Sequence, residues 1–310
     1  CFILFCLFTL TIIYAGVRNG IERVSKFMMP ILIVLSVLIA VYSVTRPGAM
    51  EGVKYFLVPN VKNFSWMTVV AAMGQMFYSL SIAMGILITF GSYMKKETSL
   101  EDSTRNVEVF DTAIAIMAGL MIIPAVFAFS GGDPDTLQAG PALMFITIPK
   151  VFENMGFGTV VGILFFLLVL FAAVTSSIAL TESAVSTFED ELGWSRRRAT
   201  VLVGVIMIAL GSLSSLGYGP LVGIKIIGMQ FLDFFDFLTN SVMMPIAAML
   251  TSLFVSRIVG MKRMEEEIMH GESTFRRKKI FIVMIKYLCP VFALIILISS
   301  VANAFGWIAM

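Results

Sequence analysis

Residues 75–85 read QMFYSLSIAMG, and they place polar and small side chains in the middle of an otherwise apolar window that runs from 66 to 94. A helix in lipid satisfies its own backbone hydrogen bonds, so a break at membrane depth survives only where it faces protein, water or a bound solute. Such a break is a candidate binding site. The sequence therefore predicts that the chain is unwound around Ser79 to Gly85 and that the exposed peptide groups hold a solute.

The composition is that of a membrane protein. Hydrophobic residues make up 58% of the chain and charged residues 14%, with 27 Phe, 22 Met and a mean hydropathy of +0.94. This apolar share exceeds that of ordinary soluble domains. About eight windows are long enough to cross roughly 30 Å of hydrocarbon, at residues 1–15, 24–45, 66–94, 107–131, 156–187, 199–216, 233–256 and 280–308. We therefore predict an all-α integral membrane protein in which residues 1–310 form a single transmembrane domain.

Basic residues are distributed unevenly between the loops. The loops after the first, third, fifth and seventh windows carry most of the Lys and Arg, including the runs at 196–198 and 276–279. The opposite loops hold only Arg46, Lys54, Lys62, Lys150 and Lys225. By the positive-inside rule the first set of loops is cytoplasmic and the C-terminus is outside. The net charge of +2 is small and its basic residues are topological, so the expected partner is the lipid bilayer and not nucleic acid.

Nothing in the chain favours an enzyme. The only histidine, His270, lies in a loop, and no Ser/His or metal constellation lies within the membrane windows. The cysteines Cys1, Cys6 and Cys289 lie in apolar windows without metal-ligand spacing, which favours a packing role. The chain begins at Cys1 inside an apolar run, without Met or a basic region, so we expect a fragment that lacks its N-terminal part and not a signal peptide.

Four polar clusters inside the windows are candidates for ligand binding, because such groups need a partner or a function in lipid. In the broken window Gln75, Ser79 and Ser81 supply polar groups, whereas Tyr78 and Met84 supply apolar walls. Unwound backbone there can bind both ends of a zwitterion and can ligate a hard cation. The alternative interpretation is a kink with small residues at a helix contact.

The second and third clusters offer oxygen ligands. Asp111 stands at the start of an apolar helix, where a carboxylate suits Na⁺ or H⁺; the alternative is a carboxylate that reaches the cytoplasmic interface. The carbonyl of Ala172 and the hydroxyls of Thr175 and Ser176 share one helical face, because positions three and four apart are neighbours. These oxygens can form half of an alkali-cation shell, unless the hydroxyls only bond to backbone carbonyls or join helices.

The fourth cluster is Asp236, which lies among phenylalanines near the outer end of the seventh window. It is consistent with a gate formed by an ion pair, or with an aromatic belt that contains a solvated carboxylate. Glu182 follows Thr175 on the same predicted helix. We expect Glu182 to pair with a basic group in the missing N-terminal part, and we assign it no role.

Six segments occur in the same order in a known family. They are GIERVSK at 20–26 with Met29-Pro30 after it, residues 74–85, PAVFAF at 124–129, FITIP at 145–149, TSSIA at 175–179 and FEDEL at 188–192. In these segments the chain resembles the bacterial neurotransmitter:sodium symporters, the leucine-transporter (LeuT) family. The resemblance covers essentially the whole chain and implies a LeuT-type inverted-repeat helical bundle. It implies that this transporter domain contains the family's helices four to eleven, in an eleven-helix branch that includes tyrosine and hydrophobic amino-acid transporters.

The resemblance also implies roles for individual residues. Ser79 and Asp111 match the family's first sodium site, and Ala172, Thr175 and Ser176 match its second. The substrate-pocket positions match at Tyr78, Ser79, Ser81, Met84, Ser176, Ala179 and Leu180. The external gate matches at Gln75 and Asp236, and its arginine would lie on the absent first helix.

Two departures from the family pattern carry expectations of their own. Asp111 stands where many relatives have Asn. Its negative charge would replace that of the chloride ion that animal members use. We therefore expect transport that does not depend on chloride. Ala83 and Met84 replace the Gly and Phe of the leucine transporter, so a preference for leucine does not follow. A flexible methionine wall favours bulkier apolar or aromatic substrates.

The sequence thus predicts a secondary active transporter in the inner (plasma) membrane of a bacterium. It would carry out Na⁺-coupled symport of a hydrophobic or aromatic amino acid by alternating access, with two Na⁺ sites and no need for chloride, and a homodimer is a possible assembly. The first alternative is a proton-coupled amino-acid carrier that uses Asp111 and Glu182. The second is a truncated product or partner subunit that transports nothing by itself.

Overall fold

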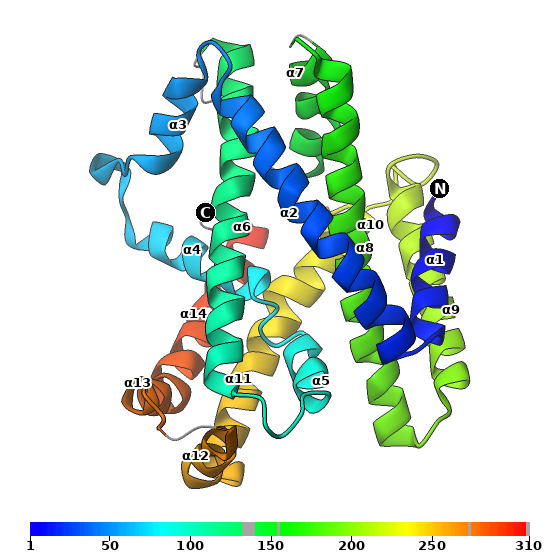
Figure 1. The fold of residues 1–310 in the computed structure, drawn as a ribbon, viewed down its shortest axis with the longest axis vertical. Coiled ribbons are helices and arrows are strands. Elements are labelled where there is room, and N and C mark those ends of the chain that lie inside the picture. The colour runs from blue at the N-terminus through cyan, green and yellow to red at the C-terminus, as the bar shows by residue number, and fades with distance from the viewer. Residues whose placement is uncertain (132–139, 154–155, 272–273, 308–310) are drawn as a thin grey trace. The chain divides into compact units, whose positions relative to one another are not determined.

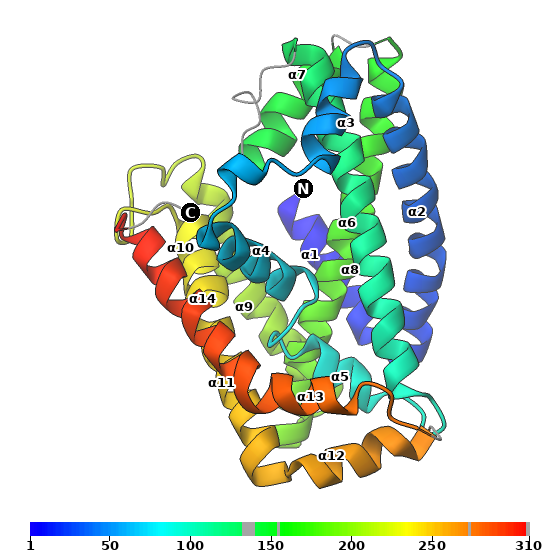
Figure 2. The same ribbon diagram turned by 90° about the vertical axis from the view of Figure 1, so that its left-hand side faces the viewer.

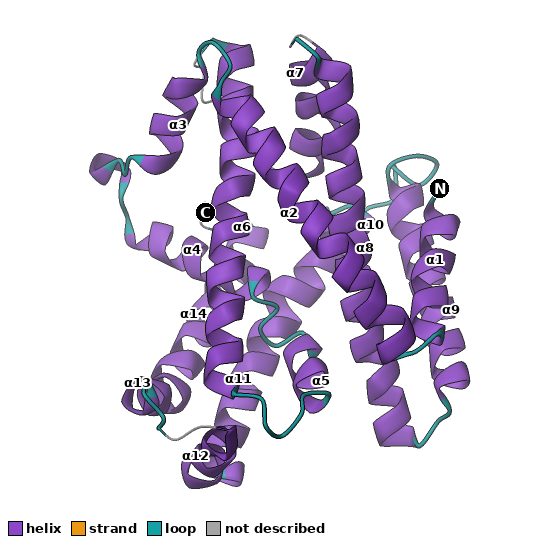
Figure 3. Cartoon of the chain, viewed as in Figure 1, coloured by secondary structure: helices purple, strands orange, loops and turns teal. Residues whose placement is uncertain are grey.

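All regular structure in the described part of the chain is helical. The computed structural model describes residues 1–131, 140–153, 156–271 and 274–307 (Figure 3). Within these ranges the only strand-type pairing is an isolated bridge between Ile226 and Met229. The prediction of an all-α protein is confirmed.

The α-helices follow one another along the chain as Figure 1 labels them. The short 3₁₀ and π turns between them are named η and are not labelled in the figure. In order they are α1 (Phe2–Tyr14), η1 (Val17–Ile21), α2 (Glu22–Val44), α3 (Ala49–Leu57), η2 (Val61–Asn63), α4 (Trp66–Ser79), α5 (Ile86–Ser92), α6 (Leu100–Ser130), η4 (Leu143–Thr147), α7 (Ile148–Glu153), α8 (Gly158–Leu192), α9 (Arg196–Gly217), α10 (Phe231–Asp236), η5 (Phe237–Met243), α11 (Met244–Phe254), η6 (Val255–Val259), α12 (Met261–Ile268), η7 (Met269–Gly271), α13 (Lys278–Val283), η8 (Met284–Leu288) and α14 (Cys289–Ala304).

Six helical stretches in the described ranges are long and apolar enough to cross a membrane. They are Glu22–Val44, Leu100–Ser130, Gly158–Leu192, Arg196–Gly217, Phe231–Val259 and Lys278–Ala304. These six correspond to six of the predicted windows. The first window forms the shorter apolar helix α1, of 13 residues, and the window from 66 to 94 is divided between α4 and α5.

Three prolines follow directly on π turns. Pro149, Pro245 and Pro290 are each the second residue of an α-helix, and a π segment precedes each of these helices: η4 before α7, η5 before α11 and η8 before α14. A proline has no N–H group, so it leaves a carbonyl in the preceding turn without its helical donor. The turn widens at that point, which is a common cause of local irregularity in long helices.

The carbonyl that Pro290 leaves free has a partner on another helix. The N–H of Cys289 donates to the carbonyl of Met284, so the next carbonyl, that of Ile285, would need the N–H that Pro290 lacks. The buried hydroxyl of Ser252 on α11 donates to the Ile285 carbonyl instead. A serine thereby satisfies a backbone group at membrane depth, as proline in a transmembrane helix requires.

The described chain divides into two compact units. The first contains residues 1–14, 65–108 and 179–310, and the second contains residues 15–64 and 109–178. The long helices α6 and α8 contribute residues to both units. The single transporter domain expected from the sequence stays a prediction.

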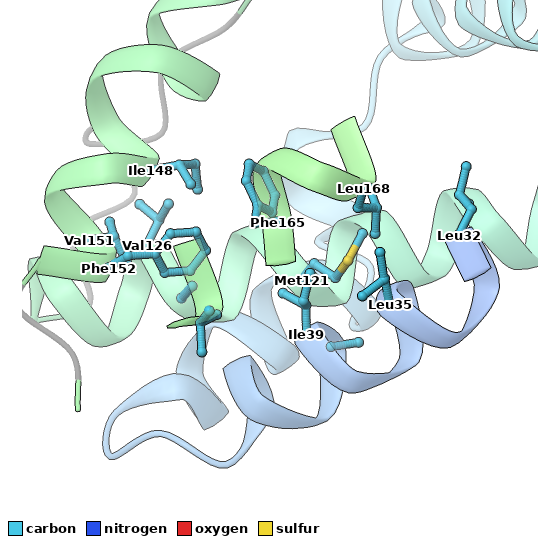
Figure 4. Packing of buried hydrophobic residues seen from close by; sticks show 13 residues of the cluster. Leu32, Leu35, Ile39, Met121, Val126, Ile148, Val151, Phe152, Phe165 and Leu168 are labelled. Atoms are coloured by element: carbon cyan, nitrogen blue, oxygen red, sulfur yellow. The ribbon is translucent and has the colours of Figure 1, made fainter. Parts of the chain in front are cut away.

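The core of the second unit lies between α2, α6 and the first part of α8. Buried residues of α2, among them Leu32, Leu35 and Ile39, recur every three or four positions, which produces one apolar stripe. This stripe joins Met121 of α6 and Phe165 of α8 in one cluster (Figure 4). The Ser43 hydroxyl of α2 donates to the Met121 carbonyl at 2.8 Å and joins α2 to α6.

In the first unit, α11 packs along α14 and α1 packs along α9. Figure 2 shows α11 and α14 side by side. Helix α14 also contacts α4, so the broken window has a continuous helix beside it. At the start of α13 the exposed Arg277 donates twice to the Glu108 carboxylate, at 3.0 and 2.8 Å, and this bonding raises the pKa of Arg277. The segment before α13 is thereby joined to the start of α6.

Candidate functional site

The helix is broken where the sequence predicts it. Helix α4 ends at Ser79, and α5 begins only at Ile86 (Figures 1 and 3). A capping box at Ser65 starts α4, where the Ser65 hydroxyl and the backbone N–H of Thr68 pair. The segment between Ser79 and Ile86 therefore belongs to neither helix.

Three residues of the break adopt left-handed backbone conformations. Ser81, Ala83 and Gly85 have φ angles of 54°, 63° and 78°. Glycine tolerates this region, whereas each other residue there costs about 1–2 kcal/mol. Strain of this kind persists where the surroundings impose it, and it is concentrated at functional sites.

The break leaves peptide groups open. The N–H groups of Leu80, Ser81 and Ile82 close the last turn by donating to the carbonyls of Met76, Tyr78 and Phe77, respectively. Beyond them, among the described residues, the N–H groups of Ala83 and Met84 have no backbone acceptor. These two groups can bind an anionic group that lies against the break.

The predicted substrate residues of the first unit lie at the end of α4, within the break and on α8. Tyr78 and Ser79 form the exposed end of α4, whereas Ser81 and Met84 are half-buried within the break. Ala179 and Leu180 lie on α8, and the Leu180 side chain is half exposed. Ser176, one turn earlier on α8, belongs to the second unit. The assignment of these residues to a substrate pocket stays a prediction.

The two predicted gate residues line one cavity. This cavity, of about 380 Å³, lies between α4, the α10–α11 stretch and α14, and its polar lining includes Gln75, Asp236, Asn240 and Ser300. The Asn240 side-chain amide donates to the Asp236 carboxylate at 2.5 Å across one turn of η5. The fold thus brings Gln75 and Asp236 to the same space from segments far apart in the sequence. Their role as a gate is not tested by this arrangement.

The residues predicted for the second sodium site lie on one turn of α8. The Thr175 hydroxyl donates to the carbonyls of Phe171 and Ala172, at 3.1 and 3.0 Å. The Thr175 hydroxyl and the Ala172 carbonyl lie on one helix face and are bonded to each other, which is the alternative interpretation of this cluster. The second sodium site therefore stays a prediction. For the first sodium site, Ser79 lies in the first unit and Asp111 in the second, so their joint role stays a prediction.

Glu182 is part of an ion-pair network inside the first unit, so the expectation of a partner in a missing segment is wrong. Its side chain is fully buried. Arg196, at the start of α9, donates to both Glu182 oxygens at 2.5 and 3.2 Å, and also to the Ile13 carbonyl at 2.8 Å. The Tyr93 hydroxyl donates to Glu182 at 2.7 Å. The network thus joins α1, α8 and α9 to Tyr93, the residue directly after α5.

The sequence contained a signal for this network that we interpreted differently. Arg196 belongs to the basic run at 196–198, which the positive-inside rule assigns to topology. The short turn at residues 193–195 makes α8 and α9 neighbours, so a carboxylate late in α8 is within reach of an arginine early in α9. A buried carboxylate requires such a charged partner.

Comparison with known proteins decides the family. The model of the Sodium:neurotransmitter symporter family matches residues 2–306. The chain belongs to this family. The resemblance inferred from the six segments is thereby confirmed, and the symporter family is a family of transporters.

Several known proteins are similar to this chain. The uncharacterized sodium-dependent transporter YhdH of Bacillus subtilis is 35% identical over 271 residues, which are 87% of this chain and 59% of that protein. An uncharacterized sodium-dependent transporter of Haemophilus influenzae is 32% identical over 96% of this chain and 64% of its own length. A crystal structure of MhsT in complex with L-phenylalanine matches 96% of this chain and 66% of MhsT, with 36% identity and a TM-score of 0.82.

The chain therefore spans somewhat less than two thirds of the length of these symporter relatives. The match to MhsT confirms the predicted LeuT-type fold. Together with the six apolar helices it identifies a multi-pass membrane protein.

Proposed function

We propose that the protein is a Na⁺-coupled symporter that takes up an amino acid by alternating access. The observation that carries this proposal is the unwound segment between α4 and α5, with its left-handed residues and open N–H groups. Membership of the symporter family supports the coupling to sodium. A break at this depth serves a transporter, because it supplies polar groups at the membrane centre without a charged side chain.

Each end of the amino acid has a suitable group at the break. The N–H groups of Ala83 and Met84 are donors for the carboxylate. The last carbonyls of α4 carry partial negative charge, because they lie at the C-terminus of a 14-residue helix, and they favour a cation. Joint binding of cation and carboxylate neutralises both, so each ligand increases the affinity for the other.

Sodium is assigned to two sites in this proposal. Ser79 and Asp111 form the first, and Ala172, Thr175 and Ser176 form the second. The carboxylate of Asp111 balances the charge of the bound cation, so transport needs no chloride. The proton-coupled alternative relied on Asp111 and Glu182, and it is weakened because Glu182 is paired with Arg196.

The substrate is proposed to be a hydrophobic or aromatic amino acid. Tyr78 and Met84 would contact its side chain, with Ser81, Ser176, Ala179 and Leu180 completing the pocket. A methionine wall adapts to side chains of different shape. The crystal structure of MhsT contains L-phenylalanine, which is consistent with a pocket of this kind in a related protein.

Uptake by the protein, made at its native length and reconstituted in liposomes, tests the proposal. An inward Na⁺ gradient at fixed pH should drive uptake of radiolabelled tyrosine, tryptophan or leucine, and replacement of chloride by gluconate should not change the rate. Uptake driven by a pH gradient without Na⁺ would favour the proton-coupled carrier. Absence of Na⁺-dependent uptake or binding of any amino acid would refute the proposed function.

A further inference from the structure

Three buried hydroxyls lie between α5 and the last part of α8. Thr89 of α5 and Ser183 and Ser186 of α8 are only 8%, 7% and 8% exposed. The Thr89 hydroxyl oxygen lies 3.4 Å from that of Ser183 and 3.3 Å from that of Ser186. We call these three residues the hydroxyl seam. It joins the inner half of the broken helix to α8 within the first unit.

The hydroxyl seam reaches the break itself through Ser183. The Ser183 hydroxyl donates to the carbonyl of Met84 at 3.5 Å. It also lies against Gly85, where an added Cβ would come within 2.6 Å of the hydroxyl oxygen. Gly85 is left-handed as well, with φ of +78°. Only glycine satisfies both conditions, so Ser183 and Gly85 form a close contact that fixes the end of the break.

The seam continues the face of α8 that carries the proposed ligand residues. Ser176, Ala179, Ser183 and Ser186 follow one another at intervals of three or four residues, so their side chains lie along one side of the helix. Ser183 is one turn beyond Ala179. The groups that hold the break and the groups proposed to contact the substrate therefore follow one another along one face of α8.

We propose that Ser183 and Thr89 are positioning residues for the substrate pocket, an inference that rests on the proposed function. Neither contacts the substrate. Ser183 holds the Met84 carbonyl and Gly85, and Thr89 holds Ser183 from the helix that follows. Together they set the position of the Met84 side chain, which in turn sets affinity and the preference between large and small apolar substrates.

Uptake kinetics of variants made at native length test this inference. Ser183→Ala and Thr89→Val each remove a seam hydroxyl, and Thr89→Ser keeps it. Thr187→Val is the matched control, because the Thr187 hydroxyl donates to the Ser183 carbonyl within α8 itself at 2.8 Å. KM and maximal rate are measured for tryptophan and for leucine, and the thermal midpoint of each variant is measured in parallel.

The positioning role predicts a change in KM. Ser183→Ala and Thr89→Val should raise KM by about two- to tenfold, the effect of losing one buried hydrogen bond. They should also change the tryptophan-to-leucine KM ratio, with a maximal rate close to that of wild type. Thr89→Ser and Thr187→Val should retain wild-type values.

Two results would overturn the inference while leaving the proposed function intact. One is wild-type KM values in Ser183→Ala and Thr89→Val, with or without a lower thermal midpoint, since a purely structural contact has that signature. The other is an equal rise in KM for Thr187→Val. If Ser183→Ala does not fold, the comparison of KM between Thr89→Val and Thr89→Ser tests the inference by itself. Wild-type protein without Na⁺-dependent uptake would remove the proposed function and this inference together.

Discussion

At the scale of single residues, the break is held in a strained conformation. Ala83 has a φ of 63°, a region that a side chain with a Cβ occupies at a cost of about 1–2 kcal/mol. Ala83→Gly should therefore stabilise the folded protein, or leave its stability unchanged where the greater freedom of glycine in the unfolded chain offsets the gain. The thermal midpoint in detergent measures this effect.

The control is Ala72→Gly in the regular part of α4, which should lower stability by about 1 kcal/mol because glycine is unfavourable within a helix. A loss for Ala83→Gly as large as that for Ala72→Gly would contradict the strain at Ala83.

The buried pair of Glu182 and Arg196 allows a second prediction. Arg196→Gln alone should destabilise the protein by about 3–5 kcal/mol, because it leaves the fully buried Glu182 carboxylate without its charged partner. Glu182→Gln should cost less, because Arg196 is 23% exposed and keeps its ion pair with Glu189. The double variant should cost less than the sum of the two. Chemical denaturation gives the free energy of unfolding of the wild type, the two single variants and the double variant, which together form a double-mutant cycle.

Glu189→Gln serves as the control for this cycle, because Glu189 is a more exposed partner of the same arginine and should cost at most about 1 kcal/mol. Strict additivity of the Glu182 and Arg196 variants would show that the two residues are not coupled.

At the scale of helices, Ser252 replaces the hydrogen bond that Pro290 removes. Ser252→Ala removes the donor of the Ile285 carbonyl, so it should cost about 1–3 kcal/mol of stability. Pro290→Ala restores an N–H group to the ladder, and in that background Ser252→Ala should cost much less. Thermal midpoints of the single and double variants test this compensation.

Ser214→Ala is the control for the Ser252 test, since the Ser214 hydroxyl donates to the Leu210 carbonyl within its own helix. The interpretation fails if Ser252→Ala costs the same with and without Pro290.

Helices were more predictable than their interruptions. Long apolar windows give the six spanning helices directly, and the small and polar residues from Ser79 to Gly85 identify the break. The π turns before Pro149, Pro245 and Pro290 were not foreseen, because a proline predicts a kink but not how the preceding turn widens. The sequence pattern within one helix does not show which residues of different helices touch. The contact of Ser183 with Gly85 is an example, because it depends on how α8 packs against the end of the break.

At the scale of the whole molecule, the distribution of basic residues predicts its orientation. Lys62→Cys and Lys279→Cys, each in a variant with Cys1, Cys6 and Cys289 replaced by Ser, should react differently with a membrane-impermeant maleimide. Position 62 should be labelled in intact cells, and position 279 only after permeabilisation, because the basic loops stay inside. The reverse pattern would invert the proposed topology and place the C-terminus in the cytoplasm.

The fold and the family follow from the sequence. Sites that combine residues of both compact units do not. Membership of the symporter family is confirmed, whereas transport by this protein is the proposed function. Ser79 and Asp111 lie in different compact units, so their pairing depends on an arrangement of units that no local pattern encodes. Gln75 and Asp236 differ from Ser79 and Asp111 in this respect, because both lie in the first unit. There they line one cavity.

The length of α8 links this transporter to the thickness of its membrane. Its 35 residues extend about 52 Å at 1.5 Å per residue, whereas the hydrocarbon layer is roughly 30 Å deep. The helix must tilt or project from the bilayer, and the acidic residues Glu189, Asp190 and Glu191 make its C-terminal end the one that projects. A change in acyl-chain length would then shift the boundary of water along the turns that carry Glu182 and Ser183. The thickness of the host membrane would thereby act on the same helix that carries the hydroxyl seam.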